Sequence, residues 1–142
     1  SYNGKCFDIP LLQSRIRLHR IGGGLAGLPH LDLMYTVRRA FRRHWPDCRL
    51  QTAERRLLGI ERVDELPGAE APAAWRAWLC QHNCGPLQAV LQHNFQDVAS
   101  LALLHRRLVA TYAGTGPKDM DHAAAGRACI DAGDTQRARR VW

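Results

Sequence analysis

Several features that define other classes of protein are missing from this sequence of 142 residues. No apolar run approaches the roughly 20 residues that a membrane-spanning helix needs, and the N-terminus lacks the basic and apolar regions of a secretory signal. The five cysteines show no CxxC spacing, and Cys80 and Cys84 have no second ligand pair, which argues against structural zinc and indicates free thiols. These absences predict a cytoplasmic protein that is not inserted in a membrane.

Lysine is scarce too, although the chain is basic. The net charge is +7 and the pI about 9.7, and Lys5 and Lys118 are the only lysines. Positive charge favours an anionic partner, of which nucleic acid is the commonest, and arginine suits bidentate contact with phosphate. A solvated basic surface and a GC-rich genome are alternative explanations of this composition. The arginines that could follow a phosphate backbone lie close together in the sequence, and they are Arg38, Arg39, Arg42 and Arg43.

The apolar pattern is mostly helical. The first eight residues are expected to form a strand end and a turn, and the alternation over residues 30–34 predicts a short strand. Residues 22–27 formally match a dinucleotide-binding glycine pattern, but they follow a helix and precede a strand, so we interpret them as a flexible loop. An irregular linker with a turn at Pro67-Gly68 is expected over residues 61–70. Helices are expected from Asp8, over residues 35–43, from Thr52 to Gly59, from Pro72, over 87–112, and over about 119–131 and 135–142.

Two acidic residues stand where a phosphodiester-cleaving site could form. Asp8 lies at the expected strand-to-helix turn, and Asp97 lies on the longest helix, one turn after His93. Carboxylates from separate elements are the ligands that Mg²⁺ prefers, and a nearby histidine can accept a proton from an attacking water. Asp8 could instead cap the first helix, and Asp97 could form a surface salt bridge while His93 lies in the core. The pattern alone leaves these alternatives open.

Six short motifs occur in order over residues 1–110. They are Tyr2-Asn-Gly-Lys-Cys-Phe-Asp-Ile-Pro-Leu-Leu12, His30-Leu-Asp-Leu33, Cys48-Arg-Leu-Gln-Thr-Ala-Glu54, Leu58-Gly-Ile60, Pro67-Gly68 and His93-Asn94-x-x-Asp97. Each is weak alone, but together they resemble the YprB-type ribonuclease H-like domain, which is similar to the DEDD 3′–5′ exonucleases. The resemblance implies an α/β fold of the ribonuclease H-like exonuclease type. The chain would carry the mostly helical C-terminal half of that fold, followed by an α-helical hairpin.

The same resemblance implies roles for individual residues. Asp8 and Asp97 would be catalytic ligands of Mg²⁺ or Mn²⁺ in a two-metal site that residues outside this chain complete. His93 would orient the attacking water, although the histidine-type subgroup places its histidine five residues before the acid and not four. Asn3 and Asn94 would lie behind the ligands and place them. Asp32 matches no ligand of the family, and we interpret it as structural.

One family motif is missing, because no Asp-x-Glu occurs in the sequence and Asp64 and Glu65 are adjacent. In the family this motif supplies two of four acids from the opening strand. The 142 residues alone are therefore expected to be inactive and marginally folded, since their helices would lack a sheet to cover. The implied function is metal-dependent 3′–5′ exonuclease-like hydrolysis of single-stranded DNA or RNA. A non-catalytic nucleic-acid-binding module and a protein-interaction scaffold are the alternatives.

The tail carries a pattern of its own. We divide the chain into a partial ribonuclease H-like domain (residues 1–112), a linker (113–118) and the start of a tetratricopeptide-like helical repeat (119–142). The residues whose spacing matches such a repeat are Gly126, Cys129, Gly133, Ala138 and Trp142. One repeat cannot bury its own face, so further repeats, and a protein partner bound through them, are expected. An ordinary helical hairpin is the alternative.

Overall fold

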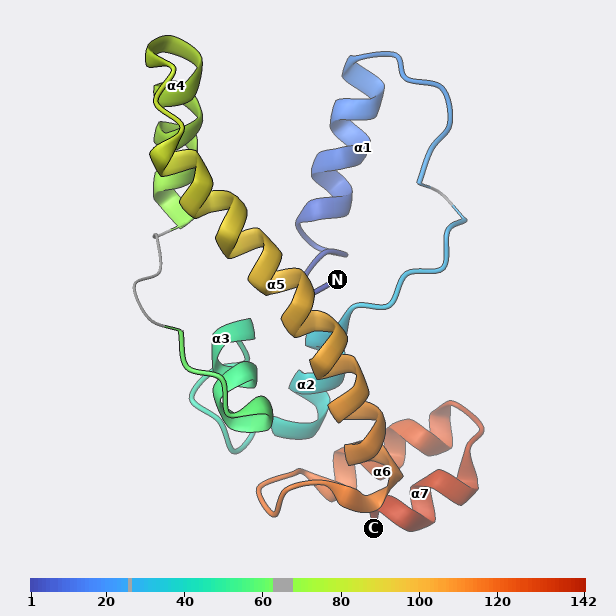
Figure 1. Cartoon of the computed structure of the whole chain (residues 1–142). Coiled ribbons are helices and arrows are strands. Elements are labelled where there is room, and N and C mark those ends of the chain that lie inside the picture. Colours follow the sequence, from blue (N-terminus) through green and yellow to red (C-terminus); the bar gives the residue numbers. More distant parts are fainter. Residues whose placement is uncertain (26, 63–67) are drawn as a thin grey trace.

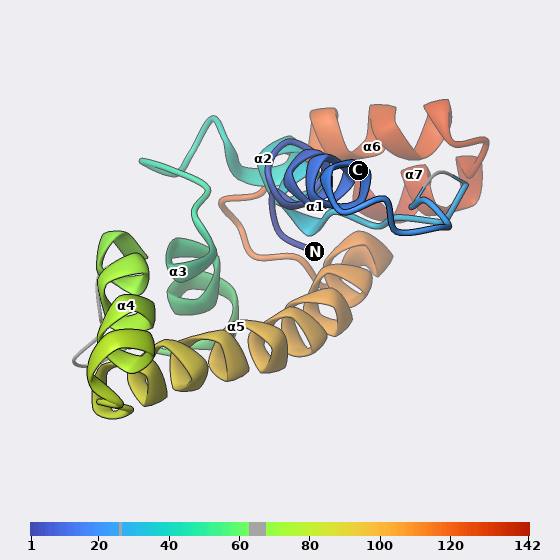
Figure 2. The ribbon, with the colours of Figure 1, turned by 90° about the horizontal axis from the view of Figure 1, so that it is seen from above.

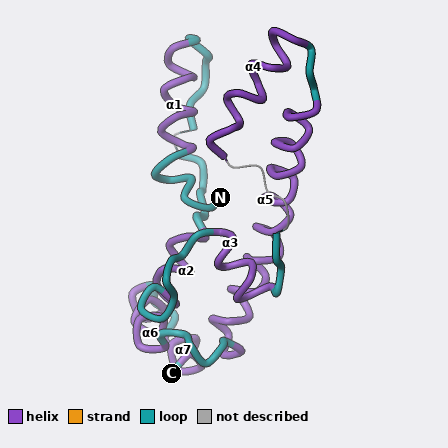
Figure 3. The backbone as a smooth tube through the Cα atoms, turned by 90° about the vertical axis from the view of Figure 1, so that its left-hand side faces the viewer, coloured by secondary structure: helices purple, strands orange, loops and turns teal. Residues whose placement is uncertain are grey.

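The structure is a computed structural model that describes residues 1–25, 27–62 and 68–142. Within these ranges the chain forms helices joined by turns and loops, and it contains no strand (Figures 1 and 3). The α-helices are α1 (Asp8–Leu18), α2 (Leu33–Phe41), α3 (Leu50–Ala53), α4 (Ala71–Gln81), α5 (Gly85–Ala110), α6 (His122–Asp131) and α7 (Thr135–Val141). Three short helical segments of other types are η1 (Glu54–Leu58), η2 (Gly68–Glu70) and η3 (Thr111–Thr115).

The expected α/β architecture is wrong for the described residues, because neither expected strand forms. The first seven residues turn instead, with Asn3 at a φ of 65° and its carbonyl accepting the N–H of Phe7 at 3.1 Å. In the second segment the carboxylate of Asp32 accepts the N–H of Met34 at 3.2 Å and caps α2. An N-terminal cap starts a helix, so this side chain overrides the alternating pattern.

The two segments do meet at one residue. The amino group of Ser1 donates to the carbonyl of Leu31 at 2.9 Å, and the N–H of Leu33 donates to the carbonyl of Ser1 at 2.9 Å. A sheet needs such pairs to repeat along both chains. Here the two segments continue into α1, which begins at Asp8, and α2, which begins at Leu33, so the backbone pairing does not extend beyond Ser1.

The core lies around α2. Its buried residues Leu33, Val37, Ala40 and Phe41 follow the helical period and form one apolar face. Trp45 stacks on Phe41 with ring centroids 4.2 Å apart, and its indole N–H donates to the carboxylate of Asp119 at 2.7 Å. The other elements add to this core Ala53, Leu57, Leu104, Leu108, Met120, Ala125, Cys129, Ala138 and Val141. Helices α6 and α7 therefore pack in the same core as α2 and α5.

Helix α5 runs along the molecule from α4 to the α6–α7 hairpin (Figure 1). It buries Ser100, Leu104 and Leu108 near its C-terminal end, whereas Leu91 and Phe95 nearer its start are exposed. Helix α1 buries no residue at all. Figures 1 and 2 show that α1 and the α4–α5 hairpin stand apart at one end of the molecule. Many large apolar side chains of that end are exposed, among them Trp75, Leu79 and Leu91.

Most helix boundaries agree with the sequence-based expectations. Gly59 ends η1 with a φ of 68°, Pro72 lies in the first turn of α4, and α6 and α7 form the expected hairpin. The N-cap of α1 is Phe7, so Asp8 lies in the first turn and makes no capping hydrogen bond. Ala26 of the expected loop and Pro67 of the expected turn lie outside the described residues. None of the described helices combines the length and apolarity that crossing a membrane requires.

Candidate functional site

Asp97 and His93 lie together on one face of α5, as their spacing predicts. His93 Nε2 is 3.5 Å from Asp97 Oδ2, and both side chains are about one-third exposed. The other carboxylate oxygen, Oδ1, accepts a hydrogen bond from Nη2 of Arg62 at 2.6 Å. Asp97 is therefore neither a solvated surface group nor a bare carboxylate, and each of its oxygens faces a basic side chain.

Arg62 joins Asp97 to a second, deeper carboxylate. Its Nε and Nη2 donate to the two oxygens of Glu54 at 2.5 and 2.6 Å. The Glu54 side chain is 0% exposed and the Arg62 side chain 4%. We call these three residues the Glu54–Arg62–Asp97 ion network. A two-pronged guanidinium–carboxylate pair fixes geometry as well as charge, so the network ties α5 to η1 at one defined position.

The turn at Gly59 makes the network possible. Its left-handed backbone ends η1, and the N–H of Ile60 returns to the carbonyl of Glu54 at 3.3 Å. This reversal brings Arg62 back over Glu54. Neither residue was predicted as part of the site, although Glu54 stands in one of the quoted motifs. Arg62 has no local signal, because its partners lie eight and thirty-five residues away.

The remaining predicted site residues are placed differently. Asp8 is exposed at the start of α1, beside Gly4, and Asn94 is exposed on α5. The backbone N–H of Asn3 donates to the carboxylate of Asp32 at 2.8 Å. That carboxylate is 3% exposed and also accepts the N–H of Lys5, which supports the structural interpretation of Asp32. The predicted ligand roles of Asp8 and Asp97, and the supporting roles of the two asparagines, stay predictions.

The described residues do not supply a complete metal site. Over residues 1–25, 27–62 and 68–142, no group of three or more His, Cys, Asp or Glu side chains is gathered so that it could hold a metal ion. Asp97 also has one oxygen engaged by a guanidinium, whose charge competes with a cation for the same lone pairs. The carboxylates of this chain therefore do not fit a two-metal centre without further ligands.

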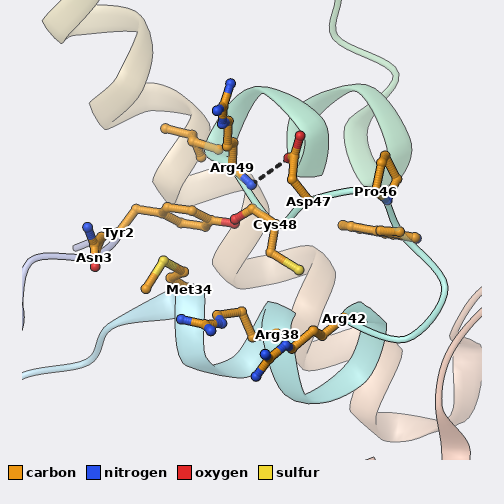
Figure 4. Close-up of a pocket in the computed structure, with 11 residues that line it drawn as sticks. Tyr2, Asn3, Met34, Arg38, Arg42, Pro46, Asp47, Cys48 and Arg49 are labelled. Atoms are coloured by element: carbon orange, nitrogen blue, oxygen red, sulfur yellow. Dashed lines mark hydrogen bonds between the residues drawn. The ribbon is translucent and has the colours of Figure 1, made fainter.

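The four predicted phosphate-binding arginines do not share one surface. Arg38 and Arg42 line a pocket beside α2 (Figure 4). Arg39 lines a different cavity, between α2, α5 and α6. Arg43 pairs with the buried carboxylate of Asp121 at 3.5 Å. Because residues on a helix point in different directions, a cluster in the sequence is divided here between three environments.

Two comparisons with known proteins find the same kind of domain. The sequence profile of the RNase H superfamily matches residues 1–109. A protein of Bacillus subtilis (strain 168), described as "Uncharacterized protein YprB", is 36% identical over 108 residues. The resemblance to the YprB-type ribonuclease H-like domain is thereby confirmed, whereas the tetratricopeptide-like tail stays a prediction.

The match covers 74% of this chain but 26% of the Bacillus protein, so the chain spans about a quarter of that relative's length. No solved structure matches the chain. The RNase H superfamily generally uses divalent metal ions. Against that background, the most informative features of the structure are the half-buried Asp97–His93 pair and the arginine that holds it.

Proposed function

Because the chain belongs to the RNase H superfamily, we propose that its protein hydrolyses phosphodiester bonds of single-stranded nucleic acid from the 3′ end. The superfamily itself indicates nuclease-like chemistry and nucleic-acid binding. The excess of positive charge supports an anionic substrate. The observation that carries the proposal furthest is the pairing of Asp97 with His93 on the half-buried face of α5.

In this proposal each residue has a separate task. His93 orients the attacking water, and Asp97 lies beside it on the same face of α5. Asp8 and Asp97 are the residues that would hold Mg²⁺ or Mn²⁺, together with carboxylates from outside this chain. The metal would stabilise the charge that develops on the phosphoryl oxygens. Asn3 and Asn94 would support this arrangement from behind.

The Asp97→Asn substitution tests the proposal in the full-length protein. We expect cleavage of a 3′-labelled single-stranded oligonucleotide to fall about a hundredfold or more, since the carboxylate is lost from the reacting groups. Binding of the same oligonucleotide, followed by fluorescence anisotropy, should change less than roughly threefold, because binding rests mainly on phosphate contacts. His93→Gln should show the same division between cleavage and binding.

The folded state needs its own control, because Asp97 also belongs to the ion network. Gln92→Ala changes an exposed residue on the same helix that has no role in the proposal, and circular dichroism shows whether each variant keeps its helices. A folded Asp97→Asn protein that cleaves at the normal rate would refute the catalytic role.

One observation favours a second candidate, a nucleic-acid-binding module without catalysis. The guanidinium of Arg62 engages an oxygen of Asp97 that a metal ligand would offer to a cation. A full-length protein that binds oligonucleotides but cleaves none with either Mg²⁺ or Mn²⁺ would support this alternative. Any cleavage abolished by Asp97→Asn would rule it out.

A further inference from the structure

A pocket of about 560 Å³ opens between α2, the N-terminal segment and the loop that leads into α3. Arg38 of α2 and Arg42, the C-cap of that helix, line it one helical turn apart, and Arg49 lines it from the opposite side. Figure 4 shows the Arg38 and Arg42 side chains lying along the same side of α2, while the Arg49 side chain extends away from α2 at the far rim. The pocket therefore presents a pair of neighbouring guanidinium groups and a third at its edge.

Three arginines and one carboxylate line this pocket, so its formal charge is net positive. Asp47 is the one carboxylate among its lining residues, all of which are described, and it is occupied by other groups. Its Oδ1 accepts the hydroxyl of Thr52 at 2.6 Å and the backbone N–H of Arg49 at 2.9 Å, and these two hydrogen bonds lower the pKa of Asp47. Burial raises the pKa of the Cys48 thiol, so this sulfur stays uncharged.

Some arginines of the described residues are engaged by carboxylates, and those of the pocket are not. Arg43 and Arg62 form ion pairs with carboxylates. Among the described residues, no such pair is formed by the pocket arginines Arg38, Arg42 and Arg49. Guanidinium groups without a protein carboxylate are free to bind phosphate in the two-pronged geometry that arginine favours.

Much of the remaining lining is apolar or aromatic, and a hydrogen bond holds its tyrosine in place. The ring of Tyr2 lies above Met34 in Figure 4, and its hydroxyl donates to the carbonyl of Cys48 at 2.7 Å. Burial raises the pKa of Tyr2 far above its ordinary value, so this phenol stays protonated and keeps that hydrogen bond. An aromatic ring fixed beside cationic groups is the combination that binds single nucleotides, because bases stack on rings and phosphates bind arginine.

We propose that this pocket binds one nucleotide of a single-stranded nucleic acid. Its phosphate contacts Arg38 and Arg42, and its sugar and base lie against Tyr2 and Met34. The volume is well above that of a lone phosphate and falls in the usual range for small-ligand sites. Asn3 lines the same pocket, five residues before Asp8, so the bound strand passes beside the segment that carries the proposed metal ligand. This inference rests on the proposed function, whose substrate it places.

The first test compares two pairs of arginines in the full-length protein. Arg38→Gln/Arg42→Gln removes two charges from the pocket, and Arg139→Gln/Arg140→Gln removes two from the exposed face of α7. Anisotropy titrations with a labelled single-stranded oligonucleotide are made at several salt concentrations. We expect the pocket variant to bind roughly tenfold more weakly, with a salt slope reduced by about 0.7 for each lost phosphate contact. The α7 variant should change less than roughly threefold.

The second test locates the ligand. Alkylation of individual cysteines, measured by peptide mass spectrometry, should slow at Cys48 when the oligonucleotide is bound. Cys80 and Cys84, which are exposed and do not line the pocket, serve as internal controls and should react unchanged. This readout depends on occupancy of the pocket and not on catalysis.

The outcomes separate this inference from the proposed function. An oligonucleotide that binds equally well to the pocket variant, or that leaves Cys48 unprotected, overturns the pocket assignment while nuclease function stands. Equal weakening by both double variants shows general charge attraction and also overturns it. If the wild-type protein binds no oligonucleotide, both proposals are overturned. The same holds if an acidic peptide, and not the oligonucleotide, occupies the pocket.

Discussion

A single buried carboxylate organises the N-terminal segment. Asp32 accepts hydrogen bonds from the backbone N–H groups of Asn3, Lys5 and Met34 at 2.8, 3.0 and 3.2 Å. It thus caps α2 and fixes the turn in which Asn3 adopts a positive φ. Since that turn carries Tyr2 and leads to Asp8, one side chain holds the wall of the nucleotide pocket and the segment of the proposed metal ligand.

Replacing Asp32 with alanine leaves these donors without an acceptor. Buried unsatisfied groups are costly, so we expect the free energy of unfolding to fall by about 2–3 kcal/mol. Asp32→Asn keeps one acceptor oxygen and should cost about 1 kcal/mol. Urea denaturation of both variants measures the difference. An alanine variant that is as stable as the wild type would show that water replaces the carboxylate.

Individual contacts could be predicted from the sequence only where they are local. The His93–Asp97 pair follows from its spacing of four residues on a helix, and the structure confirms it. The contact between Arg62 and Asp97 spans thirty-five residues and depends on how η1 packs against α5. No periodicity encodes such a distance, which is why Arg62 and the buried Glu54 were missed.

The positions of most helices can be predicted from glycine, proline and the spacing of apolar residues. Gly59 ends η1 and Pro72 begins α4, as expected, because each restricts the backbone in its own way. The prediction of a short strand over residues 30–34 was wrong, because the alternation typical of a strand and the spacing typical of a helix compete in this short segment. The apolar set Leu33, Val37 and Phe41 has the helical period, and Asp32 can cap it.

The Gly59→Ala substitution tests the turn that positions Arg62. Its φ of 68° is disfavoured for residues with a side chain, although an added Cβ would meet no atom within 4 Å. Gly59→Ala should therefore cost about 1–2 kcal/mol through the backbone alone. Gly22→Ala, at an equally open site without a positive φ, should change stability by no more than about 1 kcal/mol in either direction. Thermal unfolding followed by circular dichroism compares them.

Equal effects of the two alanines would contradict the left-handed assignment at Gly59. A loss larger than about 2 kcal/mol at Gly59 alone would show that the ion network shifts with the turn.

On the scale of the whole molecule, the apolar stripe of α5 is covered over part of its length. The spacing of residues 87–108 predicts a helix, and the structure confirms it, but Leu91 and Val98 are exposed while Leu104 and Leu108 are buried. Periodicity shows which face of a helix is apolar, and it does not show what lies against that face. The expectation of an α/β fold came from the family resemblance, and no part of the described chain forms a sheet.

Two neighbouring leucines on α5 test where the core lies. Leu104 is 0% exposed and Leu103 is 49% exposed. Leu104→Ala should lower the free energy of unfolding by about 2–5 kcal/mol, because it leaves a cavity between α2 and α5. Leu103→Ala should change it by less than about 0.5 kcal/mol. Urea titrations decide the matter, and similar losses at both positions would mean that Leu103 is covered in solution.

The packing around Trp45 has a spectroscopic consequence. All four tryptophans lie in the described residues, and Trp45 alone is buried, whereas Trp75, Trp78 and Trp142 are exposed. The indole of Trp45 touches three parts of the chain at once, since it stacks on Phe41, lies 5.6 Å from the guanidinium of Arg56 and donates to Asp119. Blue-shifted emission therefore originates at this one junction. A red shift that precedes the loss of helical signal reports the C-terminal helices leaving α2 while the rest of the chain stays folded.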